Sequence, residues 1–207
     1  MEKNIQIHHH QIRLEGRIDL YSDRWAAIVC HPHPLYGGDM DNTVVNAICQ
    51  EFSEKKITTL RFNFRGAGAS TGTFDDGIGE QADVRAVIDW LRSHDYQQII
   101  LAGYSFGAAV NAHLLAKGCD VQDHIMISPP VDFMDFQDIL SLPSTGLVVT
   151  GEEDTFATPG AVEKQIRRWQ IFPQYQVLPN CDHFYSGQMS ALKTCLADYL
   201  EKKKYCT

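Results

Sequence analysis

Short apolar runs alternate with helix-like segments along most of the chain. The apolar, strand-forming runs lie at 25–30, 58–64, 98–103, 123–128, 145–151 and 174–179. Apolar residues recur at helical spacing at 42–56, 80–94, 107–118, 159–170 and 188–204. Unbroken apolar strands between amphipathic helices are typical of a parallel sheet that helices cover on both faces. The pattern predicts a doubly wound α/β fold with a mostly parallel sheet.

The N-terminal segment has a different pattern. Residues 5–22 alternate between apolar and polar side chains around Glu15 and Gly16. This period-two pattern predicts an antiparallel hairpin at one edge of the sheet. The 207 residues contain no repeat, low-complexity tract or linker, so we expect 1–207 to form a single domain.

A candidate nucleophile lies where the run at 98–103 meets the next helix. The sequence there is GYSFG, of the form Gly-x-Ser-x-Gly, with Ser105 between Gly103 and Gly107. Glycines at these two positions allow a tight turn from strand to helix, which exposes the serine hydroxyl at the carboxyl edge of the sheet. Open α/β sheets build their sites at that edge. The motif therefore favours a nucleophilic role for Ser105 over a chance match.

A serine nucleophile requires a base and a group that orients the base. Asp154 follows the run at 145–151, and His183 follows the last strand-like run. The order Ser, Asp, His is that of the α/β hydrolases. We expect His183 to take the Ser105 proton and Asp154 to fix its tautomer. Glu152, Glu153 and Asp132 remain alternatives for the acid.

The oxyanion hole is expected from two backbone N–H groups. One belongs to Phe106, directly after the serine, and the other to the loop HPHPLYGG after the run at 25–30. Pro32 and Pro34 have no N–H, which leaves His33 by register and Leu35 as the alternative.

The same histidines suggest a rival interpretation as a metal site, formed by HPH alone or together with the HHH of residues 8–10. No Cys, His or carboxylate pattern with a known metal spacing accompanies them. We therefore expect neither a metal nor a cofactor.

Composition and charge narrow the range of partners and locations. The formal net charge is −8 and hydrophobic residues make up 44% of the chain, which disfavours nucleic acid and acidic lipid as partners. No apolar run approaches the ~20 residues that span a bilayer, and the first residues lack the pattern of a signal peptide. The six cysteines have no regular spacing and fit reduced thiols in a core. These features predict a cytoplasmic protein whose partner is a small molecule.

Taken together, the motifs HPHPLYGGDMDN, RFNFRGAGASTGTFDDGIGE, GYSFG, GEED and CDHFY resemble those of small, lidless bacterial serine hydrolases of the α/β-hydrolase superfamily. The resemblance covers nearly the whole chain and implies the roles given above to Ser105, Asp154 and His183. Dienelactone hydrolases are similar in size, but they usually carry cysteine at the position of Ser105. Arg65 and residues 75–79 are expected to brace a loop beside the site.

We expect a serine hydrolase that cleaves a small carboxylic ester or thioester through an acyl-enzyme, without a cofactor. A non-catalytic binding protein on the same fold and a histidine-rich metal-binding protein are the alternatives. The connection 129–146 is too short for a helical cap, with a short helix expected at 133–140. An open site of this kind predicts a preference for compact acyl groups. Phe106, Phe133, Phe156 and Phe184 are expected either to wall a shallow apolar pocket or to belong to the core.

Overall fold

The strands of the protein form one continuous sheet. The computed structural model describes residues 2–203 and 205. Residues 1, 204, 206 and 207 of the expected domain, and with them residue 204 of the expected last helix, lie outside the described residues. The described strands are β1 (Lys3–His9), β2 (Ile12–Asp19), β3 (Trp25–Cys30), β4 (Thr58–Phe62), β5 (Gln98–Tyr104), β6 (Asp123–Ile127), β7 (Thr145–Gly151) and β8 (Gln174–Leu178). The α-helices are α1 (Thr43–Glu54), α2 (Ile78–Ser93), α3 (Phe106–Ala116), α4 (Pro159–Arg168) and α5 (Met189–Lys203).

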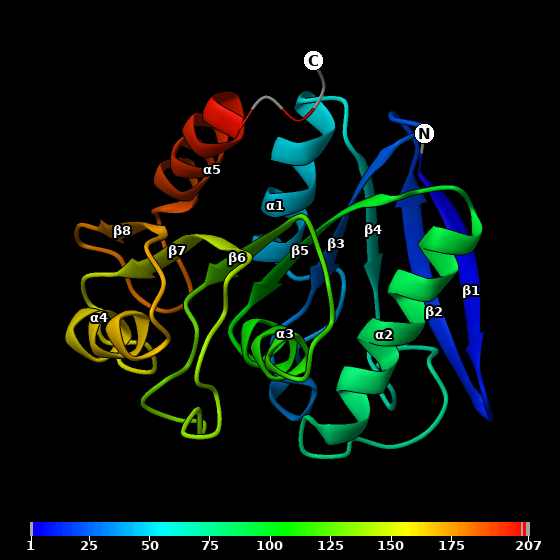
Figure 1. The fold of residues 1–207 in the computed structure, drawn as a ribbon, viewed down its shortest axis with the longest axis horizontal. Coiled ribbons are helices and arrows are strands. Elements are labelled where there is room, and N and C mark those ends of the chain that lie inside the picture. The colour runs from blue at the N-terminus through cyan, green and yellow to red at the C-terminus, as the bar shows by residue number, and fades with distance from the viewer. Residues whose placement is uncertain (1, 204, 206–207) are drawn as a thin grey trace.

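The order of strands in the sheet is β1-β2-β4-β3-β5-β6-β7-β8. Strands β3 to β8 pair in parallel, whereas β2 pairs antiparallel with both β1 and β4. Figure 1 shows the twisted sheet with the hairpin β1–β2 at one edge and β8 at the other. The predicted α/β fold, with its mostly parallel sheet and antiparallel N-terminal hairpin, is confirmed.

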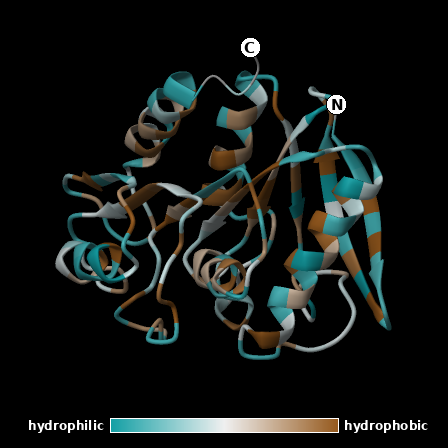
Figure 2. Ribbon diagram, in the orientation of Figure 1, coloured by the Kyte–Doolittle hydropathy of each residue, from teal (hydrophilic) through white to brown (hydrophobic). Residues whose placement is uncertain are grey.

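Helices cover both faces of the sheet, and each layer has its own apolar core. Buried residues of α2, α3 and α4 form one core with the sheet, and buried residues of α1 and α5 form the other. The same division is visible in Figure 1, where α1 and α5 lie together and away from α2, α3 and α4. Figure 2 shows hydrophobic residues in the central strands and alternating hydropathy along the hairpin. Because both faces are covered, nearly all residues of β3 to β7 are buried.

The hairpin forms as predicted, but its turn lies elsewhere. The strands β1 and β2 meet at His10 and Gln11, with His10 at a φ of 51°, whereas Gly16 pairs with Ile5 and Phe62 in the middle of β2. A Cβ on Gly16 would come within 3.2 Å of a backbone oxygen of β4, so this glycine serves the close approach of two strands. The alternation of apolar residues fixes the faces of a hairpin but does not locate its turn.

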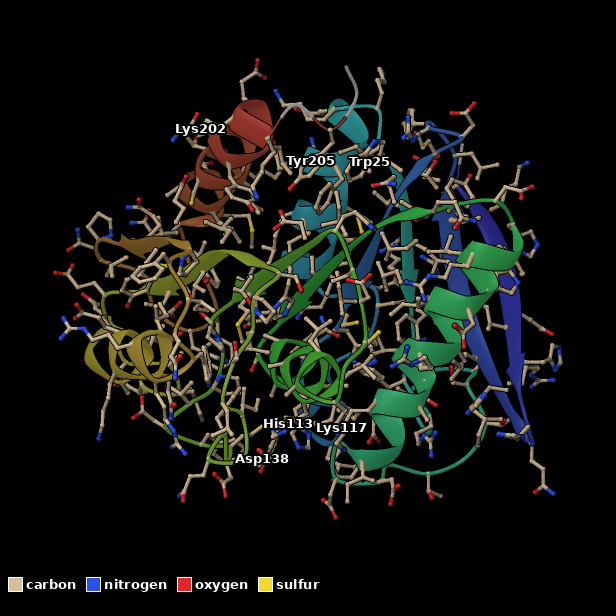
Figure 3. The ribbon with its side chains drawn as sticks, viewed as in Figure 1. Trp25, His113, Lys117, Asp138, Lys202 and Tyr205 are labelled. Carbon is tan, nitrogen blue, oxygen red and sulfur yellow. The ribbon has the colours of Figure 1, made fainter. Side chains whose placement is uncertain are left out.

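The connection between β6 and β7 consists of turns and irregular segments, with no helix among its described residues, so the helix expected at 133–140 is wrong. Phe136, Ile139 and Leu142 are buried at a spacing that resembles a helical face. The segment is held instead by His113 of α3, whose Nε2 donates to the carbonyl of Asp135 at 3.0 Å and whose Nδ1 lies 3.4 Å from the Asp138 carboxylate. Figure 3 shows His113 and Asp138 close to each other below α3.

Two tyrosines near the C-terminus contact the amino-terminal end of β6. Asp123, which begins β6, is buried and accepts hydrogen bonds from the hydroxyls of Tyr199, at 2.5 Å, and Tyr205. The Tyr205 ring also packs on Trp25 with 4.8 Å between ring centroids, as Figure 3 shows. No described helix has the length and apolar character needed to cross a membrane.

Candidate active site

Ser105 stands at a strained turn between β5 and α3. Its φ of 52° and ψ of −116° lie outside the regions that most residues adopt, and its N–H donates to the carbonyl of Ile127 at 2.9 Å. A Cβ on Gly103 would come within 2.5 Å of the Gly107 backbone, and one on Gly107 within 2.5 Å of the Cys30 carbonyl. Only glycine fits at either position, so the motif produces the tight strand-to-helix turn that the sequence predicts.

The structure brings Ser105, His183 and Asp154 together from separate parts of the chain. The Ser105 hydroxyl lies 3.0 Å from Nε2 of His183. Nδ1 of His183 lies 2.9 Å from each carboxylate oxygen of Asp154. Asp154 follows β7 and His183 follows β8, and β7 and β8 are neighbours in the sheet. The carboxylate accepts from Nδ1–H, which leaves Nε2 free to accept the serine proton.

His183 and two backbone N–H groups surround the Asp154 carboxylate. The N–H groups of Phe156 and Ala157 donate to its Oδ1 at 2.9 and 2.8 Å. Burial raises the pKa of this carboxyl, but the hydrogen bond and charge of His183, together with the other donors, outweigh burial and hold the pKa below its ordinary value. Asp154 is therefore an ionised partner for the histidine.

His183 is fixed from two further sides. The Tyr104 hydroxyl donates to the His183 carbonyl at 2.9 Å, and the Phe156 ring packs against the imidazole at 4.8 Å between centroids. Tyr104 lies next to Ser105 in the sequence, so the segment that presents the serine also anchors the histidine loop. Sequence reasoning did not assign this role to Tyr104, although its position inside GYSFG was a signal.

The other acids considered from the sequence have different partners. Asp132 accepts from the N–H and the hydroxyl of Thr158 at 2.8 and 2.7 Å, at the start of α4. Glu152 accepts from the N–H of Asn180 at 3.0 Å, and Glu153 is exposed. Asp154 is the acid that contacts His183.

The loop after β3 lies on the opposite side of the serine. Its short 3₁₀ helix, Pro34–Tyr36, begins after His33, whose Nδ1 accepts from the N–H of Leu35 at 3.3 Å. His33 lines the cavity at Ser105, and its ring lies 4.8 Å from that of Phe106, whereas the Leu35 side chain is exposed. The structure thus places His33 and Phe106 beside the serine, whereas the Leu35 N–H is bound to the His33 ring.

His31 supports this loop from below. Its Nδ1 donates to the carbonyl of Pro32 at 2.6 Å, and its Nε2 accepts from the N–H of Phe64 at 3.0 Å. The side chain has no exposed surface, and burial lowers its pKa to about 4. His31 is therefore neutral and links the loop after β3 to the end of β4. The sequence pattern gave no signal for this role of His31.

A cavity of about 510 Å³ opens at Ser105. Besides the serine and His183, its walls are formed by apolar, aromatic and small residues: Pro32, His33, Tyr36, Gly37, Gly38, Asn42, Tyr104, Phe106, Pro130, Phe133, Met134, Phe156 and Phe184. Among the described residues that line it there is no Lys, Arg, Asp or Glu. The four phenylalanines considered from the sequence all line this cavity, and Phe106 is at the same time part of the core.

Known proteins share the sequence pattern and the fold of this chain. Residues 35–204 match the family model described as X-Pro dipeptidyl-peptidase (S15 family). The chain belongs to the S15 family. It is also 33% identical over 200 residues to an uncharacterised protein of Rickettsia prowazekii (strain Madrid E), covering 91% of this chain and 84% of that protein.

Solved structures place this S15-family chain among the α/β serine hydrolases. An α/β serine hydrolase homologue from Coxiella burnetii is 32% identical, with 96% of this chain and 97% of that chain covered and a TM-score of 0.88. A protein of Xanthomonas campestris, described as an α/β serine hydrolase without lid, is 33% identical, with 100% and 96% covered and a TM-score of 0.88. The resemblance inferred from the motifs is confirmed, and the chain is a hydrolase of the α/β type.

Arg65 of this S15-family chain braces the loop before α2. Its guanidinium forms an ion pair with the buried Asp83 of α2, with 2.7 Å between Nη2 and Oδ1, and its backbone N–H donates to the same carboxylate at 3.0 Å. A Cβ on Gly79 would come within 2.1 Å of the guanidinium, so the helix begins closely packed on Arg65. Neither Arg65 nor residues 75–79 line the cavity, which agrees with the expected structural role.

The histidines outside the site do not gather with other ligands. His8 lies on β1, whereas His10 lies in the turn that follows it. Within the described part of the chain, no group of three or more His, Cys, Asp or Glu side chains has an arrangement able to hold a metal ion.

Proposed function

We propose that the protein is a serine hydrolase that cleaves a small, uncharged carboxylic ester or thioester through an acyl-enzyme. The contact that carries the proposal is the 3.0 Å hydrogen bond between the Ser105 hydroxyl and Nε2 of a histidine whose Nδ1 is held by Asp154. A serine hydroxyl is a weak nucleophile until a base of this kind accepts its proton. The strained turn and the aspartate that orients the base support the same role.

The reaction follows from these contacts. Ser105 Oγ attacks the carbonyl carbon while its proton passes to Nε2 of His183. The tetrahedral intermediate collapses, the bond to the leaving oxygen or sulfur breaks, and His183 returns the proton to the leaving group. Water then attacks the acyl-enzyme with His183 as base, releasing the acid and restoring the serine. No cofactor is required for these steps.

The backbone N–H groups of Phe106 and His33 are proposed to form the oxyanion hole. Phe106 begins α3, so its N–H belongs to the positive end of a helix dipole. For His33 the support comes from the peptide plane that it shares with Pro32. The C=O and N–H of a trans peptide point in opposite directions, and the Pro32 carbonyl is held by the buried His31 ring. The His33 N–H is thereby turned away from His31, toward the cavity that Pro32 and His33 line.

An ester or thioester suits this cavity better than an X-Pro peptide. A dipeptidyl-peptidase must recognise the ammonium group at the N-terminus of its substrate, for which a carboxylate is the natural partner. No carboxylate of the described residues lines the cavity. The net charge of −8 and the lack of lining Lys or Arg likewise favour an uncharged substrate over an anionic one.

The test combines active-site labelling with a small set of substrates. A fluorophosphonate probe should label the wild-type protein and not Ser105→Ala, and the variant should lose about 10⁶ in kcat while remaining folded by circular dichroism. Removing one hydroxyl leaves no large cavity, so the loss is chemical.

Ethyl acetate, a thioester and Gly-Pro-4-nitroanilide are then compared by kcat/KM. Hydrolysis of the ester or thioester well above the anilide supports the proposal. A higher kcat/KM for Gly-Pro-4-nitroanilide would contradict the proposal and identify the protein as a peptidase. Absence of labelling and of turnover would favour a binding protein.

A further inference from the structure

The cavity is walled by a continuous series of ring contacts that begins and ends at the reacting residues. We call the rings of Phe106, His33, Tyr36, Phe133 and Phe156 the aromatic collar. Starting from Phe106, next to the serine, successive centroid separations are 4.8 Å to His33, 4.8 Å to Tyr36, 6.3 Å to Phe133 and 5.8 Å to Phe156. Phe156 then contacts His183 at 4.8 Å.

Two members of the collar expose large apolar surfaces beside the nucleophile. Tyr36 is 76% exposed and Phe133 is 53% exposed, although each contacts another ring of the collar. They come from different loops, after β3 and after β6, and both line the cavity at Ser105. Single exposed aromatic residues are common on protein surfaces. Two exposed rings that contact each other beside a cavity can pack their faces and edges against a bound ligand.

The loops that carry the collar are held in place before any ligand binds. The N–H of Phe133 donates to the Pro130 carbonyl at 3.0 Å. Asp132 ties this turn to the Phe156 loop, because its N–H donates to the Phe156 carbonyl at 3.0 Å and its carboxylate binds Thr158. Rings that are already positioned lose little conformational entropy when a ligand packs on them.

We propose that the substrate carries an aromatic ring, in its acyl part or in its alcohol part, and that the aromatic collar recognises this ring next to the ester that Ser105 attacks. This inference rests on the proposed function for the identity of the bond that is cleaved. Edge-to-face and offset contacts with the collar favour a flat π-system over a saturated ring of the same size. The uncharged walls accept a ring without an ionic substituent.

Matched pairs of esters separate aromatic recognition from simple apolar burial. For the acyl part the pair is ethyl 3-phenylpropanoate and ethyl 3-cyclohexylpropanoate, and for the alcohol part it is 2-phenylethyl acetate and 2-cyclohexylethyl acetate. Two methylenes insulate each ring from the ester, so intrinsic reactivity is closely similar within a pair. The cyclohexyl compounds have the larger apolar surface, and a cavity that selects for apolar area alone would prefer them.

We expect kcat/KM to favour the phenyl compound by about fivefold in one of the two pairs, and the pair that responds identifies the part of the substrate that bears the ring. Phe133→Leu and Tyr36→Leu should bring that ratio toward one. Phe172→Leu is the matched control, because Phe172 is fully exposed and lies outside the cavity. It should leave the ratio unchanged. A ratio of one or less in both pairs for the wild-type protein would overturn the inference.

Binding to Ser105→Ala separates this inference from the proposed hydrolase. The same four esters are titrated into the variant by calorimetry, where they are not consumed. If the wild-type protein hydrolyses none of them but the variant binds a phenyl ester more tightly than its cyclohexyl partner, ring recognition stands and the hydrolase falls. If all are hydrolysed without preference, the hydrolase stands and ring recognition falls. If none binds and none is hydrolysed, both fall.

Discussion

Nε2 of the buried His31 accepts a hydrogen bond of 3.0 Å from the backbone N–H of Phe64. With this nitrogen occupied as an acceptor, Nδ1 carries the proton and donates to the Pro32 carbonyl. One neutral imidazole thus joins the end of β4 to the loop that supplies the proposed oxyanion donor His33. We expect His31 to affect catalysis through the Pro32–His33 peptide and not through contact with substrate.

Replacing His31 should therefore lower kcat with little change in KM. In His31→Leu the Pro32 carbonyl loses its donor and the His33 N–H is no longer held in place, so we expect kcat to fall by roughly 10- to 100-fold, less than the loss of a whole oxyanion donor. His31→Gln, whose amide both donates and accepts, should recover part of the rate. A trifluoromethyl ketone that mimics the tetrahedral intermediate should bind His31→Leu more weakly than it binds the wild-type protein. An ester substrate should bind equally well to Ser105→Ala and to the double variant that combines Ser105→Ala with His31→Leu. Unchanged kcat in folded His31→Leu would contradict the role.

The second prediction concerns the acid of the triad. Asp154→Asn should lower kcat by roughly 10⁴, because the amide favours the wrong tautomer of His183. Glu152→Gln and Glu153→Gln are matched controls from the same loop and should stay close to the wild-type rate. Asp132→Asn should lower stability more than kcat, because Asp132 binds Thr158 at the start of α4. If Asp132→Asn lost most of its activity and Asp154→Asn kept nearly all of it, Asp132 in the segment after β6 would be the acid that orients His183.

The third prediction is a fall in stability between neutral and acidic pH caused by two buried histidines. Burial lowers the pKa of His31 to about 4 and that of His124 to about 3. In the unfolded chain both take up a proton near pH 6.5. Between pH 6.5 and these lower values the unfolded state binds more protons, so the free energy of unfolding decreases as pH falls, by up to ~1.4 kcal/mol per pH unit for each histidine.

Urea unfolding at pH 7.0, 6.0 and 5.0 measures this dependence. His124→Leu removes one of the two groups and should flatten the decrease, whatever its effect on stability at pH 7.0. His8→Gln, at an exposed position of β1, is the control and should follow the wild-type slope. A slope in His124→Leu as steep as that of the wild type would show that His124 does not contribute.

The fourth prediction is that long acyl chains bring no advantage. The connection between β6 and β7 has no helix or strand among its described residues, and the cavity measures about 510 Å³. Each methylene that stays in water forgoes about 0.8 kcal/mol of burial, so kcat/KM should not rise along a 4-nitrophenyl ester series beyond octanoate. The series runs from acetate to palmitate below micelle concentrations. A steady rise to palmitate would contradict this prediction and indicate an extended acyl-binding groove beside Ser105.

The sequence was sufficient where a local pattern determines the geometry. The glycines around Ser105 require the tight turn, and the apolar runs require a covered sheet, so the fold and the strained turn at Ser105 were both predictable. The turn at His10 and the turns at 133–140 were not, because alternation does not locate a turn and buried Phe136 and Ile139 imitate a helical face. His31 and Tyr104 act through backbone atoms of distant segments. Such contacts depend on the register of the sheet, which one sequence does not reveal.

The connection after β6, which has no helix or strand among its described residues, also affects how an acyl group attached to Ser105 would be released. Ser105 is only 9% exposed, but the cavity of about 510 Å³ at its side chain leaves room for a small nucleophile beside an acyl group attached there. Water is only one such nucleophile. For the proposed esterase, product composition in a mixture of water and a primary alcohol should follow the relative concentrations and nucleophilicities of the two, and an alcohol-rich medium should yield a new ester.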